Sequence, residues 1–276
     1  MRAAVVKNSS LPRYHAAAAA FSKQAAAYDR DDAANPILGA MRAQVYDHID
    51  QYLGKECNIL ELNAGTGIDA LRFVKKGHNV HCVEVADGMV NEIKNKISAN
   101  ALGSRWSVYQ KSFTDLESVD VQHIDYVFSN MGGLNCTKDL RAVFQPLVPK
   151  LNPGAVLTLV IMTHLSPWDW LSFFTLRWRH ATRRLGRGPV MAHLLGETFE
   201  VFYHSIADTK KALGTKFKLV QTESLGLFLP PPDKTYLPKN FPRLFSMLKK
   251  IDRSTRNIFP FNRVGDHVVM TFQYTG

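Results

Sequence analysis

Short apolar runs alternate with helical apolar patterns between residues 58 and 163. Runs rich in β-branched and other apolar residues predict strands at 58–62, 79–85, 106–109, 125–129 and 155–162. Between them, apolar residues recur at helical spacing within 70–74, 89–97 and 140–147. This alternation predicts βαβ units, and therefore a parallel sheet with helices on both faces.

The pattern continues on both sides of this region. Apolar residues at every fourth position from Met41 to Leu53 predict an amphipathic helix before it. After it, residues 217–227 and 264–274 are strand-like, and a proline-rich connection separates them. There is no internal repeat, and one α/β domain accounts for the pattern.

The composition is that of an ordinary globular protein. Of the 276 residues, 46% are hydrophobic and 21% are charged, which excludes disorder over most of the chain. The longest clean apolar stretch, 155–162, is far shorter than the roughly 20 residues that a membrane-spanning helix needs. An alanine run at 16–20 follows a segment too polar for a secretion signal, so we interpret the N-terminus as a leader followed by a helix.

The three cysteines give information about the compartment. Cys57, Cys82 and Cys136 are odd in number, far apart and form no CxxC pair. This argues against a disulfide framework and against a zinc site, and it favours a reducing compartment. We therefore expect a cytoplasmic protein without a bound metal.

Positive charge is concentrated in one segment of the chain. The net charge is +10, and residues 164–260 carry 16 Lys and Arg against 7 Asp and Glu, which leaves nine of the ten net charges there. A neutral remainder with one basic segment favours a local partner surface over a chain that coats nucleic acid throughout.

Residues 164–188 predict a basic amphipathic helix within that segment. One side of its helical wheel holds Leu171, Phe174, Trp178 and Leu185. The other side holds Arg177, His180, Arg183, Arg184 and Arg187. Such a helix can lie on an anionic membrane, bind an anionic substrate, dock a partner, or pack on its own domain with a solvated basic face.

The strongest chemical signal is the sequence ILELNAGTG at 59–67, which ends a predicted strand and precedes a helix. Gly65 and Gly67 let the backbone turn sharply and approach a ligand closely, which a Cβ atom would prevent. Glu84 follows Gly65 by nineteen residues and closes the next strand. In a doubly wound sheet this carboxylate lies beside the first loop and can accept hydrogen bonds from two ribose hydroxyls. The pattern predicts a site for an adenosine-containing ligand.

Two classes of ligand match this loop. The spacing of Gly65, Gly67 and Ala70 satisfies the dinucleotide pattern, so an NAD(P)-dependent oxidoreductase is one alternative. Glu61, four residues before the first glycine, would repel a diphosphate, and Asp69 in the first helical turn weakens the site for an anion. A cationic amino-acid nucleoside fits Glu61 better.

These residues resemble the motifs of class I S-adenosylmethionine-dependent methyltransferases. Residues 61–67 are similar to that family's first motif, an acid followed by a glycine-rich turn, and Glu84 matches its ribose-binding acid. Residues 125–130 are similar to the fourth-strand motif, and 151–157 to the turn into the fifth strand.

More narrowly, residues 129–135 and 227–232 resemble a bacterial subgroup of small-molecule-type methyltransferases. The chain departs from the family pattern at two positions. Asn63 stands where the turn has its first glycine, and Ser112 stands where an aspartate is usual near the adenine, with Asp115 as a substitute.

The resemblance implies a doubly wound, Rossmann-like α/β fold with a seven-stranded, mostly parallel sheet whose last strand is antiparallel. We expect one structural domain with an N-terminal helical lid (1–57) and a cofactor-binding core (58–163). A basic, aromatic, helical cap (164–215) follows the fifth strand. The last strand pair (216–276) carries a proline-rich insertion on the substrate side.

The resemblance also implies S-adenosylmethionine as cofactor, with S-adenosylhomocysteine as product. The cofactor-binding residues it implies are Glu61, Asn63, Ala64, Gly65, Gly67, Asp69, Glu84, Val85, Ser112, Phe113, Asn130 and Met131. In-line transfer of the methyl group to an O, N or C acceptor needs alignment more than side-chain chemistry. A general base is needed only if the acceptor must lose a proton, and the candidates are Tyr28, His164, Tyr203 and His204.

We expect the acceptor to be a small or lipid-like metabolite, and the basic segment allows an acidic one. Peripheral membrane contact through the basic cap is a further expectation. A nucleic-acid methyltransferase and a noncatalytic nucleoside-binding protein are alternatives. We expect no nucleic-acid partner, because no separate RNA-binding module and no Asn-Pro-Pro-Tyr-type motif is present at the fourth strand. The pattern makes no prediction of oligomeric state.

Overall fold

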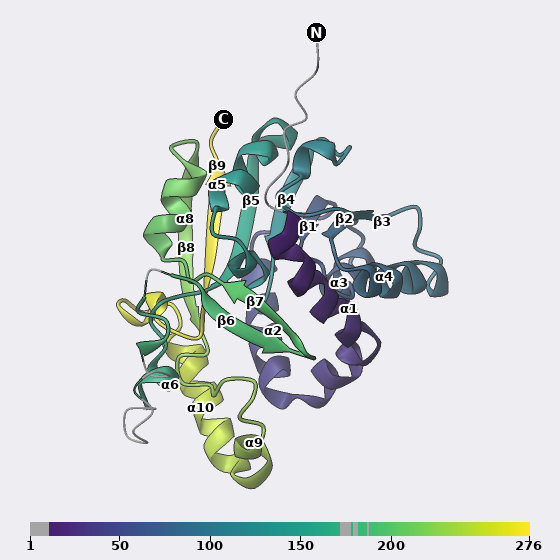
Figure 1. Cartoon of the computed structure of the whole chain (residues 1–276). Coiled ribbons are helices and arrows are strands. Elements are labelled where there is room, and N and C mark those ends of the chain that lie inside the picture. Colours follow the sequence, from purple (N-terminus) through teal and green to yellow (C-terminus); the bar gives the residue numbers. More distant parts are fainter. Residues whose placement is uncertain (1–10, 172–177, 179–181, 187) are drawn as a thin grey trace.

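A computed structural model describes residues 11–171, 178, 182–186 and 188–276 of the chain (Figure 1). Its main sheet has seven strands in the order β3-β2-β1-β4-β5-β9-β8. These strands are β1 (Asn58–Leu62), β2 (Asn79–Glu84), β3 (Trp106–Gln110), β4 (Ile124–Ser129), β5 (Leu151–Met162), β8 (Phe217–Leu225) and β9 (His267–Tyr274). The first five strands are parallel, and β9 is antiparallel to both β5 and β8. The predicted doubly wound sheet with an antiparallel last strand is confirmed.

Helices cover both faces of the sheet. One face packs against α2 (Pro36–Ile49), α3 (Ile68–Lys75) and α4 (Asp87–Ala99), which contribute Ile37, Met41, Phe73 and Ile93 to the core. The opposite face packs against α5 (Leu140–Phe144) and α8 (Ile206–Leu213), with Val143, Phe144 and Leu213 in its core.

Strand residues alternate between these two cores. Ile59 belongs to the first core and Leu60 to the second, as a period of two requires. Because both faces are buried, the central strands are predominantly apolar.

The strand and helix bounds differ from the predicted ones by a few residues. β1 begins and ends where the apolar run predicts, whereas β5 starts four residues earlier, at Leu151. The helix predicted over 140–147 ends as α5 at Phe144, and a 3-10 helix (Gln145–Lys150) follows. Pro146 and Pro149 explain this change, because proline lacks the N–H that an α-helical bond requires.

The insertion after β5 differs from the helical cap that the sequence predicts. Its described part contains the short helix α6 (Pro167–Trp170) and a hairpin of β6 (Val190–Leu194) and β7 (Glu197–Val201). Leu195 and Gly196 form the hairpin turn, both with positive φ. Phe199 and Val201 on β7 pack against Ala17 and Ala20 of the first helix, α1 (Leu11–Ala34). The hairpin therefore covers part of α1.

Arg184 does not lie on a solvated basic face, which was one of the alternatives for this insertion. Its side chain is buried and pairs with Asp169 at 2.6 Å and Asp266 at 2.5 Å. Arg183 also pairs with Asp169, at 3.0 Å. Two buried carboxylates require a cation, which favours burial of Arg184 over exposure. Among the other residues of the helical wheel, Phe174, Arg177, His180 and Arg187 lie outside the described residues.

The proline-rich connection between β8 and β9 contains two helices that the sequence analysis did not predict. It contains α9 (Tyr236–Asn240) and α10 (Pro242–Thr255). Pro242 occupies the start of α10, where the missing N–H has no intrahelical partner in any case. In the described parts of the chain, no helix is long and apolar enough to cross a membrane.

The N-terminal helix α1 lies across the carboxyl end of the sheet and docks on α4. The Asp29 carboxylate of α1 accepts a hydrogen bond from the Thr66 hydroxyl and pairs with Lys96 of α4, both at 2.5 Å. Gly88 at the start of α4 donates its N–H to the Ser22 hydroxyl at 3.2 Å. A Cβ atom on Gly88 would overlap the Ser22 carbonyl and lie 2.9 Å from its Cα atom. Close docking of α1 therefore depends on a glycine at position 88.

Gly88→Ala is expected to displace α1. The added methyl group meets backbone atoms that a side-chain rotation cannot move, so we expect a loss of about 1–3 kcal/mol in unfolding free energy. We also expect faster tryptic cleavage at Lys23 and Arg30. Gly39→Ala is the control, because a Cβ atom at this α2 position meets no atom within 4 Å. Equal cleavage rates for the two variants would contradict this role of Gly88.

Candidate functional site

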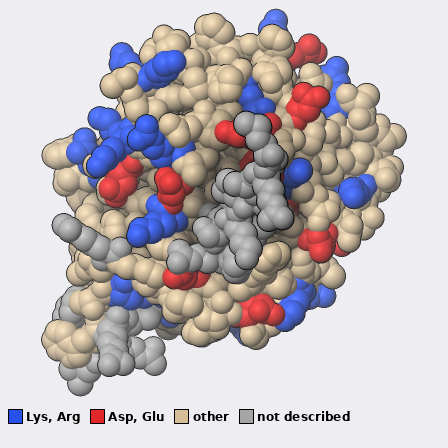
Figure 2. Space-filling model, turned by 45° about the horizontal axis from the view of Figure 1, so that its top comes forward, with Lys and Arg blue, Asp and Glu red and all other residues tan. Residues whose placement is uncertain are grey.

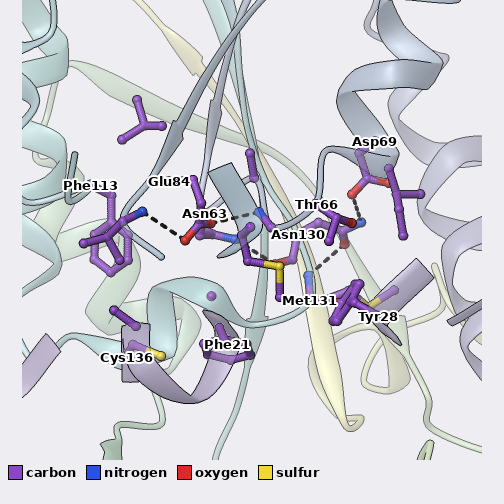
Figure 3. Close-up of a pocket in the computed structure, with 18 of the residues that line it drawn as sticks. Phe21, Tyr28, Asn63, Thr66, Asp69, Glu84, Phe113, Asn130, Met131 and Cys136 are labelled. Atoms are coloured by element: carbon purple, nitrogen blue, oxygen red, sulfur yellow. Dashed lines mark hydrogen bonds between the residues drawn. The ribbon is translucent and has the colours of Figure 1, made fainter. Parts of the chain in front are cut away.

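A cavity lies at the carboxyl ends of β1, β2 and β4, beneath α1 (Figure 3). Loop and helix residues that follow these strands line most of it, and α1 supplies the remaining wall. Its lining consists of Ala17, Ala18, Phe21, Tyr28, Arg42, Asn63, Ala64, Gly65, Thr66, Ile68, Asp69, Val83, Glu84, Val85, Met89, Lys111, Phe113, Asn130, Met131, Gly133 and Cys136. In Figure 3, Glu84 and Phe113 lie toward one end, and Asp69, Thr66 and Tyr28 toward the other.

Glu84 organises the first end of the cavity. One oxygen of its carboxylate accepts the Gly65 N–H at 2.9 Å, and the other accepts the N–H groups of Val85 and Ala86, also at 2.9 Å. Burial raises the pKa of this carboxyl above its ordinary value, while the three N–H donors oppose that rise. Gly65 has φ +56°, and a Cβ atom there would meet no protein atom within 4 Å. The turn therefore needs glycine for its backbone conformation and faces open space.

Asp69 organises the second end. Its Oδ1 atom accepts hydrogen bonds from Arg42 Nη1 at 2.7 Å and from the Tyr46 hydroxyl at 2.5 Å. Its Oδ2 atom accepts a bond from Asn130 Nδ2 at 2.8 Å. Arg42 also pairs with Asp32 of α1 at 2.8 Å. One buried polar network thus connects α1, α2, α3 and the end of β4.

Asn63 connects the first loop to the end of β4. Its backbone is left-handed, with φ +49°, which asparagine tolerates better than most residues. Its side chain donates to the Asn130 carbonyl at 3.2 Å and accepts from the Ser129 hydroxyl at 2.6 Å. The departure from glycine therefore keeps the loop conformation and adds two hydrogen bonds across the site.

Nine of the twelve predicted cofactor-site residues line the cavity, and Glu61, Gly67 and Ser112 do not. Glu61 is 2% exposed, and its carboxyl contacts the Cys82 thiol at 3.8 Å. Burial, together with the nearby Asp69, raises the pKa of Glu61 well above its ordinary value. Glu61 is therefore not among the residues that line the cavity, and its contact with a ligand amine stays a prediction.

The other two residues have local roles. Gly67 has φ +75°, and a Cβ atom there would lie 2.7 Å from the Trp106 ring, so this glycine permits close packing of the turn. The Ser112 hydroxyl lies 2.8 Å from that of Thr114, while its neighbours Lys111 and Phe113 line the cavity.

Of the four candidate bases, Tyr28 alone lines the cavity. His164 donates from Nδ1 to the Arg184 carbonyl at 2.6 Å, and the Arg184 guanidinium lies 4.9 Å from the centre of the Tyr203 ring. His204 Nε2 donates to the Thr137 carbonyl at 2.9 Å. His164, Tyr203 and His204 follow β5 in sequence, but their side chains contact Arg184 and Thr137 and do not line the cavity.

The sequence analysis predicted an N-terminal lid with Tyr28 as a site residue, but it did not name the other residues of α1 and α2 that line the cavity. Ala17, Ala18 and Phe21 of α1 line it, as do Arg42 of α2 and Cys136 after β4. The small residues of the alanine run, followed by Phe21 and Tyr28 seven residues apart, were the signal for a helix that lies closely over a ligand site.

The comparison with protein families gives one match. Residues 59–154 match the model of a methyltransferase domain. A search of curated protein sequences found no match.

Solved structures with the same fold are numerous. One is a Listeria monocytogenes protein provisionally described as an S-adenosylmethionine-dependent methyltransferase, 15% identical, with a TM-score of 0.60 over 86% of this chain and 100% of that one. Another is an S-adenosylmethionine-dependent methyltransferase of Clostridium acetobutylicum, 13% identical, with a TM-score of 0.54 over 86% and 92%. A third is the 1,6-didemethyltoxoflavin-N1-methyltransferase of Burkholderia thailandensis, 16% identical, with a TM-score of 0.56 over 100% and 94%.

The family match and the fold agree with the geometry of the site. The matched residues run from β1 into the start of β5 and include the glycine turn, Glu84, Asp69 and Asn130. The sheet order and the antiparallel β9 extend the agreement beyond the matched region. Residues 59–154, which include the loop and the acidic residue that a nucleoside site requires, therefore form a methyltransferase domain, and the chain has the fold of the solved S-adenosylmethionine-dependent methyltransferases.

Proposed function

We propose that this enzyme methylates a small or lipid-like acceptor enclosed beneath α1. The observation that carries the proposal is the make-up of the cavity. The loops after β1, β2 and β4 form the part of the cavity wall expected to hold the cofactor. Ala17, Ala18 and Phe21 of α1 form an apolar wall opposite these loops. A mostly apolar cavity with a few polar groups is typical of a small-molecule site.

The residues at the two ends of the cavity suit the parts of S-adenosylmethionine. The Glu84 carboxylate can accept hydrogen bonds from ribose hydroxyls, and Phe113 lies beside it for the adenine. Asp69 and Asn130 offer a carboxylate and an amide for the amino-acid end. A Cβ atom at Gly65, beside Glu84, would meet no protein atom within 4 Å, so the turn leaves space for a ligand there.

The cofactor supplies an activated methyl group on a sulfonium sulfur, which an acceptor O, N or C atom attacks in line. The protein contributes mainly alignment and exclusion of water. Burial raises the pKa of Tyr28, so its phenol keeps its proton at neutral pH and serves as a hydrogen-bond donor. The Asp69 and Glu84 carboxylates both accept hydrogen bonds already. This favours an acceptor that carries a free lone pair when it binds.

Two further observations bear on the acceptor. The Burkholderia neighbour was solved with 1,6-didemethyltoxoflavin and S-adenosylhomocysteine, so a chain of this fold can hold a small acceptor and the nucleoside together. Lys111 lines the cavity and is exposed, and its ammonium lies 3.9 Å from Asp115, a distance long enough for the cation also to reach an acidic group of the acceptor.

The proposal is tested by labelling with methyl-tritiated S-adenosylmethionine. The enzyme is incubated separately with an organic-soluble extract, an aqueous low-mass extract and total RNA from cells that express it. We expect label in a low-mass product of one extract and none in RNA. The Glu84→Ala variant is the control for enzyme dependence. Label in RNA alone would contradict the proposal.

A further inference from the structure

The insertion between β8 and β9 presents a surface that the methyl-transfer site does not use. We define the α9–α10 face as residues 234–263, which comprise α9, α10 and the turn that returns to β9. In Figure 1 these helices extend beyond the end of the sheet. Because β8 is parallel to β1–β5, the insertion leaves the sheet at the carboxyl edge, where the cavity also lies.

Large apolar side chains are exposed along this face. Phe259 is 69% exposed, Phe241 53%, Tyr236 52% and Met247 50%. Leu244, Ile258 and Phe261 are exposed as well. Scattered single apolar residues are normal on a protein surface, but a group within one short insertion marks an interaction site.

The apolar residues of α10 divide between two sides of the helix. Phe245 packs against the core, and the buried Asp252 carboxylate accepts the N–H groups of Phe228 and Leu229 at 2.6 and 3.1 Å. Leu244 and Met247 are three residues apart and lie on a neighbouring side of the helix, which faces outward. The core-facing side therefore attaches α10 to the domain and leaves the second apolar side uncovered by described residues.

The charge of this face has one sign. Residues 234–263 contain one acidic residue, the buried Asp252. They contain eight basic residues, namely Lys234, Lys239, Arg243, Lys249, Lys250, Arg253, Arg256 and Arg263. Lys234, Arg253 and Arg256 pair with carboxylates outside the face. No carboxylate among the described residues pairs with Lys239, Arg243, Lys249 or Lys250. On the face shown in Figure 2, by contrast, Asp and Glu lie among the Lys and Arg side chains.

Cations and apolar groups meet at the tip of the returning turn. The Arg263 guanidinium lies 5.2 Å from the centre of the Phe259 ring, the most exposed of the large apolar side chains. Nucleic acid would be attracted by the cations but offers little to aliphatic residues such as Met247 and Ile258. An anionic bilayer satisfies both, because its headgroups attract Lys and Arg while its interior accepts apolar side chains.

We propose that the α9–α10 face binds peripherally to membranes that contain anionic lipids. When the protein binds through this face, the carboxyl edge of the sheet is oriented toward the bilayer. In combination with the proposed function, on which this last step alone rests, that orientation gives a lipid-like acceptor a short path to the cavity.

The test is flotation of the full chain with vesicles of phosphatidylcholine alone and of phosphatidylcholine with one-third phosphatidylglycerol. We expect binding to the mixed vesicles only, weakened by salt because the attraction is partly electrostatic. Lys249→Glu with Lys250→Glu is expected to weaken it at least ~10-fold, since each basic residue near an anionic surface contributes about a fivefold factor. Lys210→Glu with Lys211→Glu, an exposed pair on α8, is the matched control and should bind within about twofold of wild type.

A second pair of variants examines the apolar contribution. Met247→Ser with Phe259→Ser keeps every charge and is expected to weaken binding at least ~10-fold, because two exposed apolar side chains no longer enter the bilayer. Val220→Ser on β8 is the control, since Val220 is 48% exposed outside this face. Absence of binding to the mixed vesicles, or equal losses in the α8 control, would overturn the proposal. The proposal would also be overturned if RNA competed with the vesicles for binding and the Met247→Ser with Phe259→Ser variant bound RNA as tightly as wild type. Each variant is also titrated with S-adenosylmethionine. Unchanged cofactor affinity shows that a loss of vesicle binding is separate from the methyl-transfer site.

Discussion

Glu84→Ala is expected to weaken S-adenosylmethionine binding by about 1.5–3 kcal/mol, roughly ten- to a hundredfold in Kd. The Glu84 carboxylate lies at the wall of the cavity and fixes the Gly65 N–H, so its removal affects both the ligand and the loop. Three N–H groups, those of the part-buried Gly65 and Val85 and of the buried Ala86, would also lose their acceptor.

Two further variants separate these effects by calorimetric titration. Glu84→Gln keeps one acceptor oxygen and should lose less affinity than Glu84→Ala. Glu117→Ala removes an exposed carboxylate outside the cavity and should leave Kd unchanged. If Glu84→Ala binds S-adenosylmethionine as tightly as wild type, Glu84 has no role in the cofactor site.

The second large effect is expected at Gly133, which follows β4. A Cβ atom at this position would overlap the Asn63 carboxamide and lie 2.7 Å from its Cβ atom. Asn63 cannot rotate away without losing its bonds to Asn130 and Ser129. We therefore expect Gly133→Ala to cost about 1–3 kcal/mol in unfolding free energy and to weaken cofactor binding, because both residues line the cavity.

The double variant Asn63→Gly with Gly133→Ala tests this explanation. Glycine accepts the left-handed backbone at position 63 and removes the overlapping side chain. We expect the double variant to recover most of the lost stability and affinity. In a double-mutant cycle, measured by thermal unfolding and by calorimetric titration, the two substitutions should be strongly non-additive. Additive losses would show that the Asn63 carboxamide and the Gly133 position are not coupled.

The core of the fold was predictable because its signals are local. The apolar run of β1 predicted its bounds, and the glycine turn with Glu84 predicted where the cavity lies. β6 and β7 were missed because their alternation is short and half-exposed. α10 was not predicted because the connection was described only as proline-rich, although Pro242 is compatible with the first turn of a helix.

The side-chain partners within the site depended on tertiary contacts. Spacing placed Arg184 on a basic face, but two carboxylates from distant parts of the chain, Asp169 and Asp266, draw it into the interior. Glu61 occupies the motif position of an acid, yet its side chain is buried outside the cavity wall. Neither arrangement is visible in a sequence pattern, because each depends on which elements meet in space.

The most direct test of the proposed S-adenosylmethionine site is calorimetric titration of the purified protein with S-adenosylmethionine, S-adenosylhomocysteine, NAD and NADP. We expect micromolar binding of the first two nucleosides and no binding of the dinucleotides. Binding of NAD or NADP in place of S-adenosylmethionine would contradict it, and so would a folded protein that binds none of the four.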